Sequence, residues 1–256
     1  MVSLMSNKRK NILVLVEGAK TDVKIMKQLF SVYGIDAEFE IVSYCTNIYT
    51  LYSEMFCDGI DGFEEMDIRQ VLKSKEKDSE KKKIFDKKFT DVLLIFDLDP
   101  QDPQYDPNHI KLMQKYFSDS TDMGKLYINY PMVESFYHLS SIPDQKYFER
   151  KAFLSELKDK KYKSRVQKET RGNSYNKFAK NKEEYTIVIL QNLYKALFLI
   201  NKKVVEYEDA LNHLSTVDFN ILLQEQLHNL EEYGFVYVVC TCIFFISDYD
   251  QKLLNL

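Results

Sequence analysis

The sequence of 256 residues is poor in the residue types from which many catalytic and metal sites are built, with seven glycines, four cysteines and four histidines. It has no Walker A loop and no Gly-x-Ser-x-Gly elbow, which argues against a P-loop NTPase and an α/β-hydrolase. The cysteines lack metal-ligand spacing and are interpreted as reduced, mostly buried thiols. The histidines are scattered without zinc spacing. These residues are Cys45, Cys57, Cys240 and Cys242, and His109, His138, His213 and His228.

Long hydrophobic runs are also missing. The longest, from Val236 to Ile246, is too short to cross a bilayer. The polar and basic N-terminus is followed by a short apolar stretch that ends at Glu17, which is unlike a secretory signal. With 45% hydrophobic and 29% charged residues, the composition is that of an ordinary globular protein. We therefore expect a soluble, cytoplasmic protein with no membrane partner.

The net charge of −4 conceals a strong segregation of charge along the chain. Residues 145–182 carry thirteen Lys or Arg and four acidic residues, so this segment is +9 and the rest of the chain is −13. A lysine-rich segment is usually solvated surface, but asymmetry of this size is also typical of proteins that bind a polyanion. Nucleic acid is the partner class that the pattern favours.

Two hydrophobic runs end in carboxylates. The first is Ile12 to Val16, followed by Glu17 and Gly18; the second is Asp91 to Phe96, followed by Asp97, Leu98 and Asp99. Both runs are typical of buried strands. In open α/β sheets ligands bind beyond the carboxyl ends of the strands, so these acids are expected at the functional edge.

The first half of the chain alternates strand and helix signals. A helix is expected from Thr21 to a C-terminal Gly34, and further helices over 48–56 and 110–117. Strands are expected over 37–42 and 124–129 in addition to the two above. The pattern predicts an α/β fold with a mostly parallel four-stranded sheet flanked by helices, over residues 1–140, with a charged helical insertion at about 60–90.

The second half, residues 141–256, is predicted to be basic and mainly α-helical. Helices are expected over 148–157, 183–201, 204–214 and 217–233. The segment 158–182 shows little periodicity. The run from Phe235 to Ile246 fits a strand or a buried helix, and a helix is the preferred interpretation. A bare apolar helix surface in this half would serve equally as core or as the interface of a homo-oligomer.

Glu17, Asp97 and Asp99 are candidate metal ligands. Burying a carboxylate costs several kcal/mol unless it is paired or bound to a cation. Oxygen ligands suit Mg²⁺ or Mn²⁺. Residues i and i+2 of a strand point to the same face, so Asp97 and Asp99 are expected to share a cation if the extended geometry persists to Asp99. Two such ions would stabilise the attacking and leaving oxygens of a phosphoryl transfer.

A third group of polar residues follows the last predicted strand, in the stretch from Tyr127 to His138. Pro131 would place Glu134 in the first turn of a helix, where a negative charge is favoured. Glu134 is then either a surface acid that stabilises the helix or a fourth metal ligand or base. His138 lies four residues further, on the same helix face, and is either part of the site or a packed structural histidine.

These motifs resemble those of the Toprim fold, which topoisomerases, bacterial primases, OLD-family nucleases and several phage-defence effectors share. Val-Glu-Gly-x-Lys-Thr-Asp, Phe-Asp-x-Asp and Asn-x-Pro-x-x-Glu-x-x-x-His are most similar to stand-alone RloB-like and abortive-infection Toprim proteins and to the Toprim effector of the PARIS system. The resemblance covers roughly Asn11 to Leu139.

The resemblance implies that Glu17, Asp97 and Asp99 bind the metal and that Glu134 is the later acid of the nuclease branch. OLD-type nucleases have an acid four residues after the first Glu, whereas this chain has Thr21 there and Asp22 next, so Asp22 is either a ligand or a helix cap. Lys20 is either a phosphate-steering or a solvated turn residue. The resemblance also implies a downstream lysine at the scissile phosphate. The candidates for nucleic-acid contact are Lys163, Arg165, Lys168, Arg171 and Lys177.

The function that this resemblance implies is a metal-dependent endonuclease acting on RNA or DNA, as the toxic effector of an anti-phage abortive-infection system, with tRNA as one candidate substrate. Since the chain has no ATPase motif, energy-dependent control would come from a separate ATPase partner protein. The alternative is a non-catalytic module that binds nucleic acid or a partner and keeps a structural cation. Nucleotidyl transfer, as in primases, is a third hypothesis.

Overall fold

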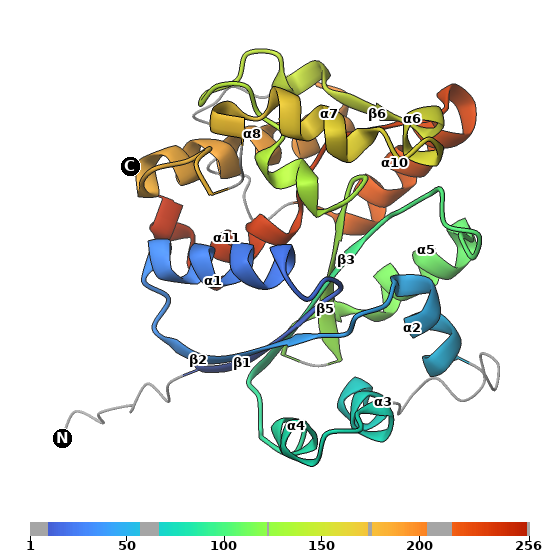
Figure 1. The fold of residues 1–256 in the computed structure, drawn as a ribbon, viewed down its shortest axis with the longest axis vertical. Coiled ribbons are helices and arrows are strands. Elements are labelled where there is room, and N and C mark those ends of the chain that lie inside the picture. Colours follow the sequence, from blue (N-terminus) through green and yellow to red (C-terminus); the bar gives the residue numbers. More distant parts are fainter. Residues whose placement is uncertain (1–9, 57–66, 122, 174–175, 204–216, 255–256) are drawn as a thin grey trace.

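The structure is a computed structural model that describes residues 10–56, 67–121, 123–173, 176–203 and 217–254. Its centre is a five-stranded sheet in the order β2-β1-β3-β5-β4, in which only the short β4 is antiparallel (Figure 1). The strands are β1 (Lys10–Val16), β2 (Ala37–Ser43), β3 (Asp91–Asp97), β4 (Ser118–Asp119) and β5 (Gly124–Asn129). The α/β class is confirmed, and the sheet has one strand more than the four predicted.

The helices of the first half connect these parallel strands and cover both faces of the sheet. Helix α1 (Thr21–Tyr33) lies on one side, and α2 (Ile48–Met55), α3 (Ile68–Lys75) and α5 (Pro107–Tyr116) lie on the other (Figure 1). A short helix, α4 (Ser79–Ile84), follows α3. Because helices cover both faces, β3 is buried at every position, as its unbroken hydrophobic run predicted.

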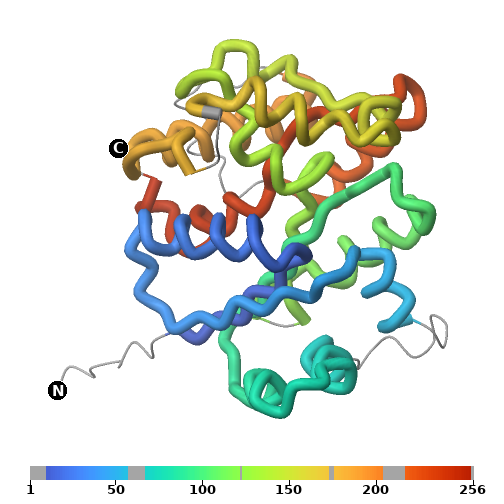
Figure 2. Tube along the Cα trace, viewed as in Figure 1, coloured from blue at the N-terminus to red at the C-terminus, as the bar shows by residue number. Residues whose placement is uncertain are grey.

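The C-terminal region is mainly helical, and its last elements return to the first helix. Phe30 of α1 packs against Phe245 of α11, with ring centroids 5.4 Å apart, so the blue helix α1 and the red helix α11 are neighbours (Figure 2). The helices of this region are α6 (Leu154–Lys158), α7 (Tyr162–Glu169), α8 (Lys182–Asn201), α10 (Phe219–Tyr233) and α11 (Phe245–Tyr249). The helix predicted over 204–214 lies outside the described residues.

Two predictions for this region are wrong. Residues 148–157 form no single helix: a 3₁₀ turn (Tyr147–Glu149) leads into strand β6 (Lys151–Phe153) and then α6. The run 235–246 begins as strand β7 (Phe235–Tyr237), antiparallel to β6, and becomes helical only after residue 241. Each segment satisfies its backbone groups by pairing with the other across about eighty residues, which a local pattern does not reveal.

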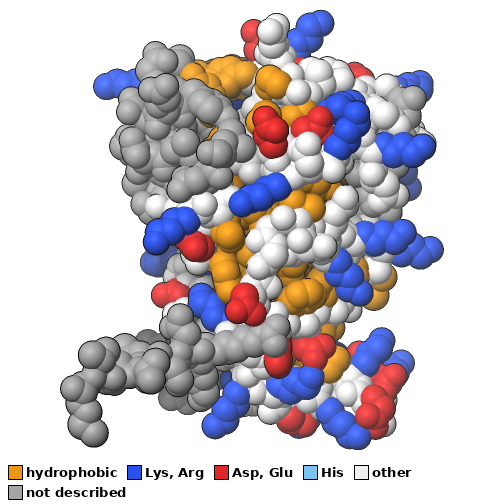
Figure 3. Space-filling model, turned by 90° about the vertical axis from the view of Figure 1, so that its left-hand side faces the viewer, with side chains coloured by type: hydrophobic (Ala, Val, Ile, Leu, Met, Phe, Trp, Pro, Cys, Tyr) orange, Lys and Arg blue, Asp and Glu red, His pale blue; other side chains and the backbone are white. Residues whose placement is uncertain are grey.

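Charged side chains break up the hydrophobic surface on the side where α1 and α11 end. Figure 3 shows that hydrophobic side chains occupy the middle of this face, with Lys and Arg side chains across it and around its edge.

Within the described part of the chain, no helix has both the length and the apolar composition needed to cross a membrane.

Candidate metal centre

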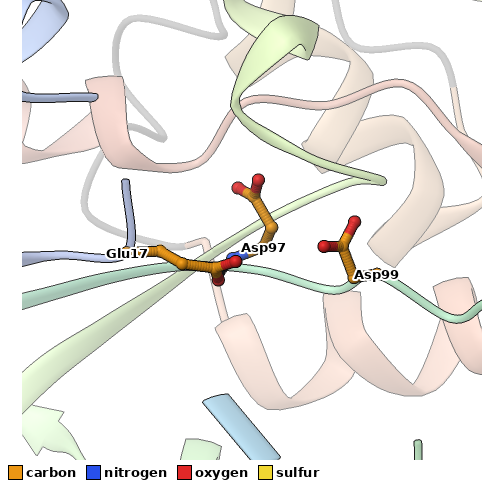
Figure 4. A group of neighbouring side chains, drawn as sticks. All are labelled: Glu17, Asp97 and Asp99. Atoms are coloured by element: carbon orange, nitrogen blue, oxygen red, sulfur yellow. Dashed lines mark hydrogen bonds between the residues drawn. The ribbon is translucent and has the colours of Figure 1, made fainter. Parts of the chain in front are cut away.

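The first carboxylate of the candidate site lies at the junction of two parallel strands. The backbone N–H of Glu17 donates to the carbonyl of Ile95 at 3.1 Å, which continues the β1–β3 ladder one residue beyond β1. The Glu17 side chain then turns across the end of β3, where its Oε2 accepts a hydrogen bond of 3.1 Å from the backbone N–H of Asp97 (Figure 4). Neighbouring strand ends therefore place Glu17 and Asp97 side by side.

Asp99 reaches the same place by a route that the sequence analysis did not predict. Extended geometry ends at Asp97, and Asp99 has φ +39°, in the left-handed region. Its backbone N–H donates to the carbonyl of Pro131 at 3.1 Å, which holds the turn against the segment that follows β5. Asp97 and Asp99 therefore do not share one strand face, because the extended geometry does not persist to Asp99, but the turn brings the Asp99 carboxylate to the other two.

Glu17, Asp97 and Asp99 converge closely enough to hold one cation. Each offers an oxygen, and these three oxygens lie within 4.8 Å of one another (Figure 4). Among the described residues, none of the three forms an ion pair with an arginine. A group of carboxylate oxygens at this spacing is a candidate site for a metal ion.

Burial and mutual repulsion disfavour the ionised form of this cluster. Burial, followed by the charge of Asp99, raises the pKa of Glu17 from 4.5 to about 8. Burial, followed by the charge of Glu17, raises the pKa of Asp97 well above its usual range, and burial also raises the pKa of Asp99. A bound cation would remove both causes, because it replaces lost hydration and offsets the repulsion.

Asp22 belongs to the same electrostatic group. It is buried in the first turn of α1, and burial raises its pKa although backbone N–H groups, including that of Gly18, donate to it. A Cβ atom at Gly18 would come within 2.4 Å of Asp22 Oδ2, so a larger residue there would displace this carboxylate. No side chain caps the start of α1. Asp22 is therefore not the N-cap residue of α1, and its carboxylate lies beside the cluster.

Glu134 also lies at the edge of the cluster. It sits in a 3₁₀ helix, Val133–Tyr137, and is 7% exposed, so it is not the surface acid that one interpretation expected. Its charge contributes to the raised pKa values of Asp22 and Asp97. Its Oε1 lies 3.1 Å from Nζ of Lys163, and its Oε2 is buried with no hydrogen-bond partner among the described residues.

The fold selects Lys163 from the five basic candidates. Lys163 lies on α7, and although burial opposes it, the charges of Glu134, Asp97 and Asp99 raise its pKa. The other candidates lie elsewhere: Arg165 pairs with Glu156, Arg171 pairs with Glu184, and Lys168 and Lys177 are exposed. Nothing in the local sequence distinguishes Lys163, because its position depends on how α7 packs against the segment that contains Glu134.

His138 and Lys20 are not part of the cluster. His138 is fully buried, where its ring nitrogens bond to the Tyr162 hydroxyl and to Oε2 of Glu169. Burial, together with the charge of Arg150, lowers the pKa of His138 to about 2, so it remains neutral. Lys20 is exposed at the start of α1. The structural interpretation of His138 and the solvated interpretation of Lys20 agree with these positions.

Asn129 is a member of the site that the sequence analysis did not select. It is fully buried at the end of β5, directly opposite Asp97, and its Nδ2 donates to Asp97 Oδ1 at 3.3 Å. Its Oδ1 accepts from the backbone N–H of Cys242 and from the Cys240 thiol, both at 3.4 Å. Its place at a strand end beside the carboxylates was the available signal. Asn129 fixes the orientation of Asp97.

Comparison with known proteins adds no assignment. No family model, curated protein or solved structure matches this chain.

Proposed function

We propose that this chain is a metal-dependent phosphodiesterase of the Toprim type that cleaves RNA or DNA and uses Mg²⁺ or Mn²⁺. The observation that carries the proposal is the convergence of Glu17, Asp97 and Asp99 within 4.8 Å at the carboxyl ends of two adjacent parallel strands. Carboxylate oxygens are hard ligands and suit these two ions better than soft or nitrogen-preferring metals.

The residues around the cluster fit a bound divalent cation. Oδ1 of Asp99 and Oε2 of Glu134 are buried without a hydrogen-bond partner in the described part of the chain. Among the described residues, five carboxylates, counting Asp22, face a single nearby lysine, Lys163. The excess negative charge and the unpaired oxygens are both features that a divalent cation would compensate.

In this proposal each residue has a defined task. A bound divalent ion supplies Lewis-acid stabilisation of charge on a phosphoryl oxygen. Glu17, Asp97 and Asp99 hold it, while Asn129 keeps Asp97 in one orientation. The Lys163 ammonium, now 3.1 Å from Glu134, is the cation in place to contact a substrate phosphate. Asp22, in the first turn of α1, and Glu134, beside Lys163 of α7, supply further carboxylate oxygens around the ion.

The direct test is cleavage of total tRNA, plasmid DNA and single-stranded DNA in Mg²⁺, in Mn²⁺ and in EDTA. We expect cleavage that requires a divalent ion and that Glu17→Ala and Asp97→Ala each abolish. Glu232→Ala is the matched control, because Glu232 is an exposed acid on α10 far along the chain. Cleavage that survives both cluster substitutions, or no cleavage of any substrate by the wild-type protein, contradicts the proposal.

The biological role that we propose next is based on the resemblance of the sequence motifs to those of Toprim proteins of phage defence. We propose that the nuclease is the toxic effector of an anti-phage system and that a separate ATPase partner controls it. Copurification with the products of neighbouring genes tests the partner, and loss of toxicity in the Glu17→Ala variant tests the effector role. Binding of nucleic acid with no cleavage in any ion would favour the non-catalytic module with a structural cation.

A further inference from the structure

A second feature of the molecule lies on the far side of α7 from the acidic cluster. Strands β6 and β7 form a small antiparallel sheet that is rich in aromatic side chains. Phe153 is 49% exposed, and Tyr233, just before β7, is 62% exposed. Both rings lie against Phe235, with centroids 5.9 and 6.0 Å from it. Exposed aromatic rings held by ring neighbours form a rigid apolar surface.

A pocket of about 570 Å³ opens beside this sheet. Its aromatic walls are Phe148, Phe153, Phe198 and Tyr237. One lysine, two arginines and a single glutamate complete the lining, so the aromatic pocket carries a net positive charge.

A second pocket, of about 540 Å³, adjoins the first. The two share Glu149 and Arg150, and the second adds the exposed lysines Lys146 and Lys168. Together the two pockets are lined by five cationic and two acidic side chains. We call these two adjoining pockets together the groove, aromatic at one end and basic at the other.

The cationic side chains of the groove differ in whether they already pair with a carboxylate. Arg150 already pairs with Asp144 and Glu169, and Arg165 pairs with Glu156. Lys151 has no carboxylate partner among the described residues; its Nζ lies 4.1 Å from the centroid of the Phe235 ring. The two arginines therefore shape the wall, and Lys151, Lys146 and Lys168 are available to an anionic ligand.

Lys195 holds this wall in place from behind. It is a fully buried lysine on α8, and its Nζ donates to the carbonyls of Tyr147 and Arg150 at 2.8 and 2.7 Å. The same Nζ lies 5.4 Å from the Tyr237 ring centroid. Because these contacts fix the strand that carries Lys151, the groove is formed before any ligand binds.

We propose that this groove binds an unpaired segment of single-stranded nucleic acid, with bases stacked on its aromatic end and phosphates on its lysines. Aromatic rings beside a basic track are the general means of binding single strands, because stacking needs bases whose faces are free. A duplex hides those faces. The inference rests on the proposed nuclease function and adds that the substrate presents a single-stranded segment.

Helix α7 joins the groove to the cluster. Lys163 reaches Glu134 from this helix, whereas Arg165 and Lys168 of the same helix line the groove. Residues two apart on a helix point in nearly opposite directions. A helix is about 10–12 Å across with its side chains. A single strand of nucleic acid that lies in the groove therefore needs to cross only one helix, α7, to reach the carboxylates.

The experiment is fluorescence anisotropy in EDTA, which prevents divalent-dependent cleavage. The probes are labelled 15-nucleotide RNA and DNA single strands of one mixed sequence, the corresponding DNA duplex, and a DNA strand with abasic sites in place of its central bases. We expect both single strands to bind, and the duplex and the abasic strand to bind at least about tenfold more weakly, because each lacks accessible base faces.

Substitutions in the groove locate the binding. Phe153→Ala is expected to raise the Kd of the single strands about tenfold, and Phe153→Tyr to restore it. Lys151→Gln is expected to lower the slope of log K against log salt by about 0.7, the contribution of one phosphate contact. The matched control is Phe39→Ala, which removes a ring that is 36% exposed on β2, an edge strand of the central sheet. Melting temperatures check that every variant is folded.

The outcomes separate this inference from the proposed function. Unchanged binding in both folded Phe153→Ala and Lys151→Gln, or equal affinity for duplex and single strand, overturns the groove. A loss of self-association on Phe153→Ala, with unchanged nucleic-acid affinity, also overturns it and assigns the surface to a second copy of the chain. If Phe153→Ala weakens binding but no divalent ion supports cleavage, the groove stands and the nuclease proposal fails. If Glu17→Ala abolishes cleavage while the groove variants bind nucleic acid normally, the nuclease proposal stands and the groove proposal fails.

Discussion

Neutralising Glu17 should make the metal-free protein more stable, and increasingly so as the pH rises. Glu17 has a pKa of about 8 in the folded chain, whereas its ordinary value is 4.5. Between these two values the folded state binds the proton and the unfolded state has released it. Folding stability from this group is therefore present at low pH and is lost as the pH rises towards 8.

The size of the effect follows from the two pKa values. Between the two pKa values of Glu17, linkage lowers the free energy of unfolding by about 1.4 kcal/mol per pH unit. Near the upper pKa the slope is about half of that. From pH 6 to pH 8, Glu17 alone should lower the free energy of unfolding by about 2 kcal/mol. Glu17→Gln removes this dependence and keeps an oxygen that accepts the hydrogen bond from the Asp97 N–H.

The assay is urea unfolding of the wild type and of Glu17→Gln in EDTA, from pH 6 to pH 8. Other buried groups titrate in both proteins, so the difference between their unfolding free energies reports Glu17 together with its repulsion of the neighbouring acids, Asp97 above all. That difference should grow by about 2 kcal/mol in favour of the variant across the range. Glu232→Gln, an exposed acid, is the control and should follow the wild type. Saturating Mg²⁺ should stabilise the wild type at pH 8 far more than Glu17→Gln.

A pH-independent difference between the two proteins would refute the reasoning. So would a wild type whose stability relative to the variant rises from pH 6 to pH 8. Either result would mean that the pKa of Glu17 is not raised in the metal-free protein and that the cluster is not a destabilised cation site.

Three further predictions concern residues around the cluster. Asp97→Asn should abolish the rise in melting temperature that Mn²⁺ or Mg²⁺ produces in the wild type, as followed by thermal unfolding. Lys163→Met should slow divalent-dependent cleavage roughly 100-fold, because in our proposal the Lys163 ammonium contacts the substrate phosphate. The rise in melting temperature with Mn²⁺ or Mg²⁺ should persist in this variant, because Lys163 is not a metal ligand. His138→Phe should lower the free energy of unfolding by about 1–3 kcal/mol in urea titrations, because the Tyr162 hydroxyl and Glu169 lose their partner.

The parts of the site that lie on uninterrupted strands were predictable. An apolar run that ends in a carboxylate has one physical explanation in an α/β protein, a buried strand whose end reaches solvent or a ligand. The sequence therefore placed Glu17 and Asp97 at one edge of the sheet, as the structure has them. The sequence placed Asp99 beside Asp97 only on the condition that the strand continued, whereas Asp99 adopts a left-handed conformation after the strand and a turn directs its carboxylate.

The C-terminal half was less predictable because its contacts are long-range. The run from Phe235 to Ile246 is too apolar for periodicity to separate strand from helix, and its first residues become a strand only because Lys151 to Phe153 lie beside them. The same limit applied to the basic residues. Sequence spacing treats Lys163 and Arg165 alike, but packing directs one to the carboxylates and the other to Glu156.

The sequence by itself therefore determined the class of fold, the strand ends and the acids at them, because hydrophobic burial is written in local patterns. Tertiary structure alone decided which lysine joins those acids, that Asn129 orients Asp97, and that His138 belongs to the core instead. It also assembled the aromatic and basic groove from residues far apart in the chain. The physical reason is that a side chain's chemistry depends on neighbours brought to it by packing, which no stretch of sequence contains.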